Sequence, residues 1–301
     1  MIKTSLFFLF FMMVFNVSSQ VKSYKLYNKF CYEAEFKTIN NKEKAWTIYN
    51  KIFKEFFPQL MHLEKAIAIG EELKKNNKKI EKELIQLINL KKFFFDKNFF
   101  LNRLSNNKTK IELKKHFIYL TENDFDYISS EKIENIFFLE KLINIDQAVR
   151  KIKNSSCKDS VIISLDKKNF QDLKKFIETK GFPSQREYGI YSLTPHFIYL
   201  HNTMYEGIIE SIATILENQI KIGNYHPSQY ARLIDRYRTW VLNEPQIYGE
   251  WIENGKIGKI LNVENVDKIR EDFGLESLYE FCLKNNLQLP LNYIIPKIYK
   301  K

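Results

Sequence analysis

The fold class is decided by residues 43–56, EKAWTIYNKIFKEF, in which apolar side chains recur at every third or fourth position. This spacing places them on one face of an α-helix. Pro58 follows, and a proline interrupts a helix because it has no amide hydrogen to donate. The stretch therefore predicts an amphipathic helix that ends before Pro58. The apolar residues of its face are Ala45, Tyr49, Ile52, Phe53 and Phe56.

The same periodicity recurs along most of the chain and predicts further helices. Turn-forming residues are scarce, with 9 Gly and 7 Pro among 301 residues, which argues against a many-stranded β fold. We therefore predict a mostly α protein, whose first helices form either loose tetratricopeptide-like pairs or an irregular helical cap. Beyond residues 43–56, helices are expected over residues 63–73, 80–88, 130–153, 170–179, 195–222, 227–242, 266–273 and 275–284.

The first residues have the three parts of a secretory signal peptide. Lys3 supplies a basic start, residues 6–15 an apolar run, and Val17 and Ser19 the small residues before a cleavage site. The run is shorter than the roughly 20 residues of a membrane span, although an uncleaved anchor is the alternative. We expect export to the periplasm or the exterior without a lipid anchor. The predicted parts are a signal peptide over 1–19, a helical N-terminal region over 20–125 and a C-terminal helical domain over 126–301.

Composition argues against several classes of function. The formal net charge is +11, but the lysines are spread among Glu and Asn and no nucleic-acid-binding motif is present. Cys31, Cys157 and Cys282 are far apart and favour free thiols over a disulfide framework. No metal-ligand spacing and no phosphate-binding glycine loop occurs, so we expect no metal and no cofactor. The sequence does not specify a partner.

Several short motifs recur in one order along the second half of the chain. Together they resemble the bacterial domain-of-unknown-function family 6624, roughly over residues 144–284. The chain departs from that family after Gly249, where Glu250-Trp251 stands in place of Thr-Gln. The resemblance implies no reaction. The motifs are Asp146-Gln147-x-x-Arg150, Gly181-Phe182-Pro183, Gly189, His201, Gly223, Leu233-Ile-Asp235-Arg236, Pro245-Gln246-x-Tyr248-Gly249 and Arg270-x-x-x-Gly274-Leu275.

The charged residues of these motifs permit a purely structural interpretation. Asp146 and Arg150 are four positions apart, so they share a helix face and can pair. Asp235 and Arg236 are adjacent and point about 100° apart around a helix, so each needs a partner elsewhere. One solution pairs Asp235 with Arg150 and Asp146 with Arg236. Such a network would fix the register of two helices.

A functional interpretation adds His201, which lies on an otherwise apolar helix. An aspartate beside it would orient its ring as a general base. An arginine would hold an anionic group in bidentate fashion, and amide and phenol groups would donate hydrogen bonds. The catalytic candidates are His201, Asp146 and Asp235, and the ligand-binding candidates are Arg150, Arg236, Gln246, Tyr248 and Gln147.

Two functions follow from these interpretations. We favour an exported binding or interaction module, and the alternative is an envelope hydrolase that uses His201 with the aspartates. We expect the polar residues to converge in space, because charged groups rarely face a core without partners. A solvent-connected cavity among them would favour the enzyme, and a closed ion network would favour the module. The converging set is Asp146, Arg150, His201, Asp235, Arg236 and Gln246.

Overall fold

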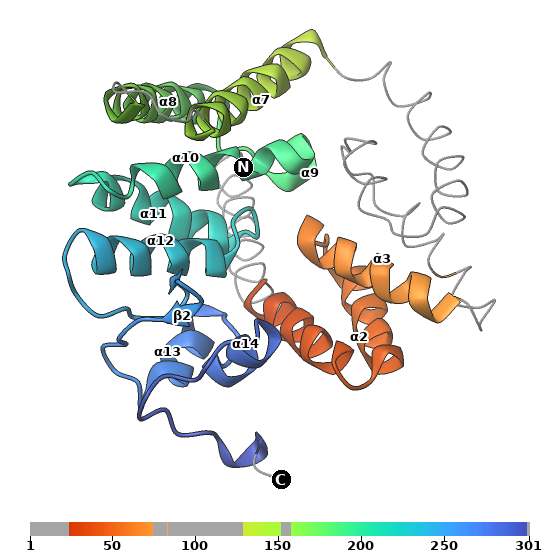
Figure 1. The fold of residues 1–301 in the computed structure, drawn as a ribbon. Helices are drawn as coiled ribbons and strands as arrows, with labels where there is room; N and C mark the ends of the chain where they lie inside the picture. The colour runs from red at the N-terminus through yellow and green to blue at the C-terminus, as the bar shows by residue number, and fades with distance from the viewer. Residues whose placement is uncertain (1–23, 75–82, 84–128, 152–157, 300–301) are drawn as a thin grey trace, which may run out of the picture. The chain divides into compact units, whose positions relative to one another are not determined.

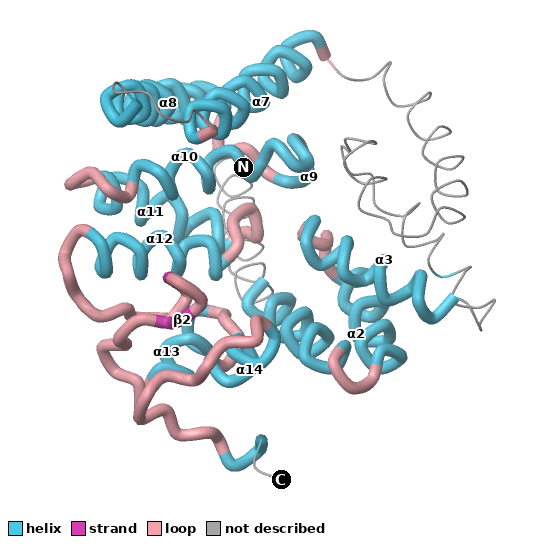
Figure 2. Tube along the Cα trace, viewed as in Figure 1, coloured by secondary structure: helices cyan, strands magenta, loops and turns pink. Residues whose placement is uncertain are grey.

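The computed structural model describes residues 24–74, 83, 129–151 and 158–299 of the chain. These residues are almost entirely helical, which confirms the prediction of a mostly α protein (Figure 1, Figure 2). Within them the β-structure is a small antiparallel hairpin of β1 (Ile252–Glu253) and β2 (Lys256–Ile257), with one isolated bridge beside it. Sequence periodicity did not predict this hairpin.

The chain divides into two compact units. Unit 1 comprises Met1–Phe36 with Thr203–Lys301, and unit 2 comprises Lys37–Asn202. The domain boundary predicted near residue 125 lies outside the described residues, as do the predicted signal peptide and most of the predicted helix over 80–88. The tetratricopeptide-like pairing therefore stays a prediction.

Unit 2 begins with the helix that decided the fold class. This helix, α2 (Lys42–Glu55), starts at Asn41, whose side chain accepts a hydrogen bond from the amide of Lys44. It ends at Phe56, which is extended, and α3 (Leu60–Lys74) packs against it after Pro58. Phe56 is thus the C-cap and not a member of the helical face. The residues that α2 buries are Ala45, Trp46, Tyr49, Ile52 and Phe53.

The remaining helices of unit 2 position the predicted site residues. The helices α7 (Ser130–Arg150), α8 (Lys158–Lys180) and α10 (Thr194–Asn202) pack against one another around buried leucine and isoleucine side chains. Helix α8 starts before the predicted residue 170 and ends at Gly181, which has a positive φ. The short α9 (Gln185–Tyr188) and η2 (Gly189–Leu193) lead into α10.

Unit 1 contains the other candidate residues. The prediction of one helix over residues 195–222 is wrong, because α10 ends at Asn202 and a separate helix begins at Ile208. Gly207 precedes the new helix with a φ of 77°, a left-handed conformation that interrupts the helical hydrogen bonds. The elements of unit 1 are a helix over residues 24–38 that extends into unit 2, α11 (Ile208–Lys221), α12 (Pro227–Trp240), the hairpin, α13 (Val266–Phe273), α14 (Leu278–Lys284) and η3 (Lys297–Tyr299).

Candidate functional site

The predicted site residues lie in two groups, one in each unit. The structure brings the members of each group together, and a meeting of the two groups remains a prediction. The unit 2 group is Asp146, Gln147, Arg150 and His201, and the unit 1 group is Asp235, Arg236, Gln246 and Tyr248.

Asp146 is the buried centre of the unit 2 group. His201 Nδ1 lies 2.9 Å from Asp146 Oδ1, and Arg150 Nη1 lies 3.1 Å from the same oxygen. Gln147 Nε2 donates a 2.8 Å hydrogen bond to the other carboxylate oxygen, Oδ2. Asp146 and Arg150 thus pair as their spacing predicts, and both carboxylate oxygens have partners inside unit 2.

Asp166 on α8 joins this group, although the sequence did not single it out. Arg150 Nη2 donates a 2.7 Å hydrogen bond to Asp166 Oδ1, and Nη1 donates one of 2.6 Å to the main-chain oxygen of Asp146. Burial raises the pKa of the Asp166 carboxyl, whereas the hydrogen bond and charge of Arg150 lower it. The available signal was helical spacing, since Asp166 stands four and seven positions before the buried residues Phe170 and Leu173.

These five residues, Asp146, Gln147, Arg150, Asp166 and His201, are called the Asp146 cluster below. Together they connect α7, α8 and α10, because each helix contributes at least one of them. His201 retains one edge for chemistry, since its side chain is 18% exposed. Its Nε2 has no hydrogen-bond partner in the part of the chain that the structure describes. If Nδ1–H donates to Asp146, Nε2 carries the lone pair that a general base needs.

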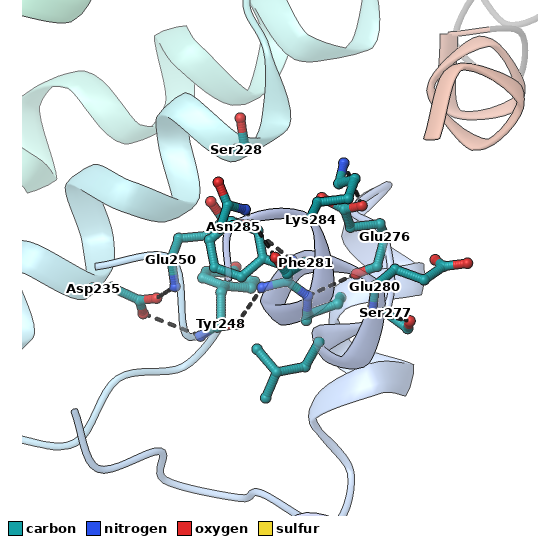
Figure 3. Close-up of polar contacts among 12 residues, drawn as sticks. Ser228, Asp235, Tyr248, Glu250, Glu276, Ser277, Glu280, Phe281, Lys284 and Asn285 are labelled. Atoms are coloured by element: carbon teal, nitrogen blue, oxygen red, sulfur yellow. Dashed lines mark hydrogen bonds and ion pairs between the residues drawn. The ribbon is translucent and has the colours of Figure 1, made fainter. Parts of the chain in front are cut away.

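In unit 1, Asp235 organises the loop that follows α12. Its Oδ1 accepts hydrogen bonds from the amides of Ile247 at 2.7 Å and Tyr248 at 3.1 Å. Its Oδ2 accepts one from the amide of Glu250 at 2.8 Å (Figure 3). Burial raises the pKa of Asp235 to about 6, while the three amide donors lower it. The sequence had offered Arg150 as a partner, but this carboxylate binds main-chain amides of its own unit.

Gln246 completes the same loop. Its Nε2 donates a 2.9 Å hydrogen bond to the main-chain oxygen of Trp251, and its Oε1 accepts one of 3.2 Å from the amide of Trp251. Its main chain bridges to Lys259 and Leu261 at 2.8 Å each. The buried amide group of Gln246 therefore holds Trp251 in place. Tyr248 packs its ring 5.1 Å from that of Phe273, and burial raises its pKa to about 12.

The fourth member of the unit 1 group, Arg236, contacts two indole rings. Its guanidinium carbon lies 4.6 Å from the ring centre of Trp240 and 5.2 Å from that of Trp251. The two rings are 5.1 Å apart and nearly perpendicular. We call Arg236, Trp240 and Trp251 the Trp240 site. The sequence offered one signal for it, because Trp240 stands four positions after Arg236 and so shares its helix face.

A second network in unit 1 was missed entirely. Arg270 is fully buried, and its Nη2 pairs with Glu250 Oε1 at 2.9 Å. Its other nitrogens donate to the main-chain oxygens of Tyr248, at 2.6 Å, and Glu276, at 2.7 Å. The sequence resemblance included Arg270 as a motif residue and gave it no partner. The structure shows that it connects α13 to the loop that Asp235 organises.

The network extends to Lys284 on α14 (Figure 3). Lys284 Nζ lies 2.5 Å from a carboxylate oxygen of Glu276 and 2.5 Å from one of Glu35, on the helix over residues 24–38. Burial raises the pKa of Glu276 to about 7, although the charge and hydrogen bond of Lys284 lower it. These contacts join segments 249 positions apart in the sequence.

Comparison of the chain with protein-family models, with curated proteins and with solved structures found no match. The likeness to family 6624 therefore rests on the motifs of the sequence. Among the described residues, no His, Cys, Asp and Glu side chains gather in a group of three or more suited to a metal ion. No helix in the same residues has the length and apolar character needed to cross a bilayer. Cys31 and Cys282 are buried free thiols, and Cys157 lies outside the described residues.

Proposed function

We propose that the chain is an exported binding module whose recognition surface is the Trp240 site. The observation that carries the proposal is the indole of Trp240, which is 41% exposed while Arg236 and Trp251 contact its ring. A large aromatic side chain that is exposed and already held in one position loses little conformational entropy when a partner covers it.

The other predicted residues of unit 1 support this surface from beneath. Asp235 and Gln246 fix the loop that carries Trp251, through hydrogen bonds to main-chain amides and oxygens. Trp251 in turn packs against Trp240. In this proposal Arg236 belongs to the recognition surface, and Asp235 and Gln246 give that surface its shape.

The chemistry of the surface favours a protein partner with an apolar anchor. Trp and Arg are the residue types that most often dominate the binding energy of protein interfaces. Leu242, two positions after Trp240, is also exposed and extends the apolar area. The indole nitrogen of Trp251 is buried and lacks an acceptor within the described residues, so it is a donor that a partner or water can satisfy.

Capture of envelope proteins tests the proposal. Tagged chain is mixed with an envelope extract of the producing cells, and the retained protein is measured at graded bait concentrations. We expect a discrete partner, and we expect Trp240→Ala to raise the bait concentration needed for half retention about thirtyfold or more. Leu261→Ala is the matched control, since Leu261 is exposed in the same unit but away from the site's residues. Equal effects of both changes would contradict the proposal.

A hydrolase that uses the Asp146 cluster is the second candidate. It is favoured by the contact of His201 with Asp146 at 2.9 Å, combined with the unpartnered Nε2 in the described residues. The purified chain would release soluble fragments from envelope polymers. General-base catalysis predicts a loss of about a hundredfold or more on His201→Gln. A release that His201→Gln leaves unchanged would exclude this candidate.

A further inference from the structure

The segment that follows α14, over residues 285–299, has an inward and an outward face. Figure 2 shows it as loop that ends in the short η3. Its inward side chains pack on the apolar core formed by residues of α13, α14 and the hairpin loop, which fixes the path of the segment. The inward residues of this kind are Leu287, Leu289 and Tyr293.

Two tyrosines and two prolines hold the segment in one conformation. Tyr293 donates a 2.6 Å hydrogen bond to a carboxylate oxygen of Asp267, and the ring of Tyr299 stacks on that of Tyr279 at 4.5 Å. The amides of Tyr293 and Tyr299 donate to the main-chain oxygens of Pro290 and Pro296, at 3.1 and 3.0 Å. Proline fixes its own φ, so each of these turns is stiff.

The outward face consists of aliphatic side chains. Leu291 is 89% exposed, Ile298 is 82% exposed and Ile294 is 69% exposed. These are the largest exposed fractions among the large hydrophobic residues that the structure describes. Three such residues within eight positions, on a segment that is otherwise anchored, form an apolar patch and not a scatter of single side chains.

The charge of this stretch has one sign. Between Phe281 and Lys301 the sequence contains no Asp and no Glu. Lys297 is exposed and stands directly before Ile298, and two more lysines follow at the next positions after Tyr299. The aliphatic patch is therefore accompanied by positive charge only.

We propose that residues 285–301 dock on a bilayer of anionic phospholipids. Aliphatic side chains would enter the boundary between headgroups and acyl chains, and the lysines would lie at the negatively charged surface. Tyrosine suits the same interfacial depth because its ring is apolar and its hydroxyl is polar. An acid-free, lysine-containing patch fits an anionic lipid surface better than a protein surface, which normally mixes both charges. The fixed conformation lowers the entropic cost of insertion.

Vesicle flotation with the full chain tests the proposal. The probes are vesicles of phosphatidylcholine alone and of phosphatidylcholine mixed with phosphatidylglycerol. We expect binding to the anionic vesicles and much weaker binding to the neutral ones. Replacing Leu291, Ile294 and Ile298 together with Ser should weaken binding about a hundredfold or more, since each removes one inserted aliphatic group. Lys297→Glu should reduce binding to the level seen with neutral vesicles.

The control and the opposite outcomes are defined by the same chain. Leu261→Ser alters a residue that is 61% exposed in unit 1 outside the segment, and it should leave flotation unchanged. Flotation of the triple variant at the level of the original chain would overturn the proposal. Self-association that the triple variant abolishes, without vesicle binding, would show that a second copy covers the patch and would also overturn it. Circular dichroism confirms that each variant is folded.

Discussion

At the scale of single residues, the buried charges are the most informative feature of the chain. Asp146 and Arg150 form an ion pair four positions apart, and so do Asp172 and Lys168 on the surface of α8. The first pair is shielded from water and shares its atoms with His201, whereas the second is exposed. Geometry along the helix is the same in both, so burial decides what each pair contributes.

Asp146→Asn should therefore lower the free energy of unfolding by about 2–4 kcal/mol. The change removes the charge that Arg150 and His201 face inside unit 2, although Arg150 keeps Asp166. Asp172→Asn is the matched control and should change stability by less than about 0.5 kcal/mol. Urea unfolding followed by circular dichroism measures both. A loss of similar size in the two variants would show that the Asp146 cluster does not stabilise the fold.

The pH dependence of stability follows from two buried carboxyls of unit 1. Folding raises the pKa of Asp235 from 3.8 to about 6 and that of Glu276 from 4.5 to about 7. Between these values the folded chain holds protons that the unfolded chain has released. The free energy of unfolding should therefore fall as the pH rises from about 4 to about 7.

Glu276→Gln isolates one part of this effect. It should remove about 2–3 kcal/mol of the decline in stability between pH 4.5 and pH 7, because Gln does not titrate. Glu271→Gln, at an exposed position, should leave the decline unchanged. Unfolding free energies measured across this pH range in both variants give the answer. A decline that Glu276→Gln leaves intact would assign it to other groups.

At the scale of elements, the sequence predicted the helices well and their partners poorly. The apolar period placed α2, α12 and α13 almost at their observed bounds, since periodicity is a local property. The spacing of Asp146 and Arg150 likewise predicted their pairing. Asp235, by contrast, binds amides of a loop that begins eleven positions later, and no spacing rule specifies such a contact. Long-range packing decides the partners of a buried charge.

The interruption between α10 and α11 shows a local signal that was misinterpreted. Gly207 lies inside an apolar period, and its φ of 77° ends the continuity of the helix. Gly207→Ala should cost about 1 kcal/mol of stability through backbone strain alone, since a Cβ there would meet no atom within 4 Å. Gly223→Ala should cost distinctly more, because its Cβ would collide with the ring of Tyr24. Thermal melts that rank the two variants in the opposite order would contradict this account.

At the scale of the whole molecule, the first described helix belongs with the end of the chain. The helix over residues 24–38 contributes Glu35 to the ion pair with Lys284 and Phe36 to the contact with Tyr299. It buries Tyr27 and Cys31 within unit 1. A division of the chain in simple sequence order would place this helix with α2.

Hydrogen exchange distinguishes the two groupings. We expect the amides of residues 24–36 to be protected to the same degree as those of α14, and to lose protection together with them in Lys284→Met. The amides of α2 should be unaffected by that change, because α2 lies in unit 2. Loss of protection in α2 together with residues 24–36, without α14, would refute the discontinuous unit.

The central claim is that the Asp146 cluster maintains the fold while the Trp240 site binds a partner. One comparison tests it most directly, namely the unfolding free energy and the retention of the envelope partner, both measured for Asp146→Asn and Trp240→Ala. The account predicts that Asp146→Asn loses stability and retains the partner below its melting temperature. It predicts that Trp240→Ala keeps its stability and loses the partner. A fully stable Asp146→Asn variant that no longer binds, beside a Trp240→Ala variant that binds normally, would contradict it.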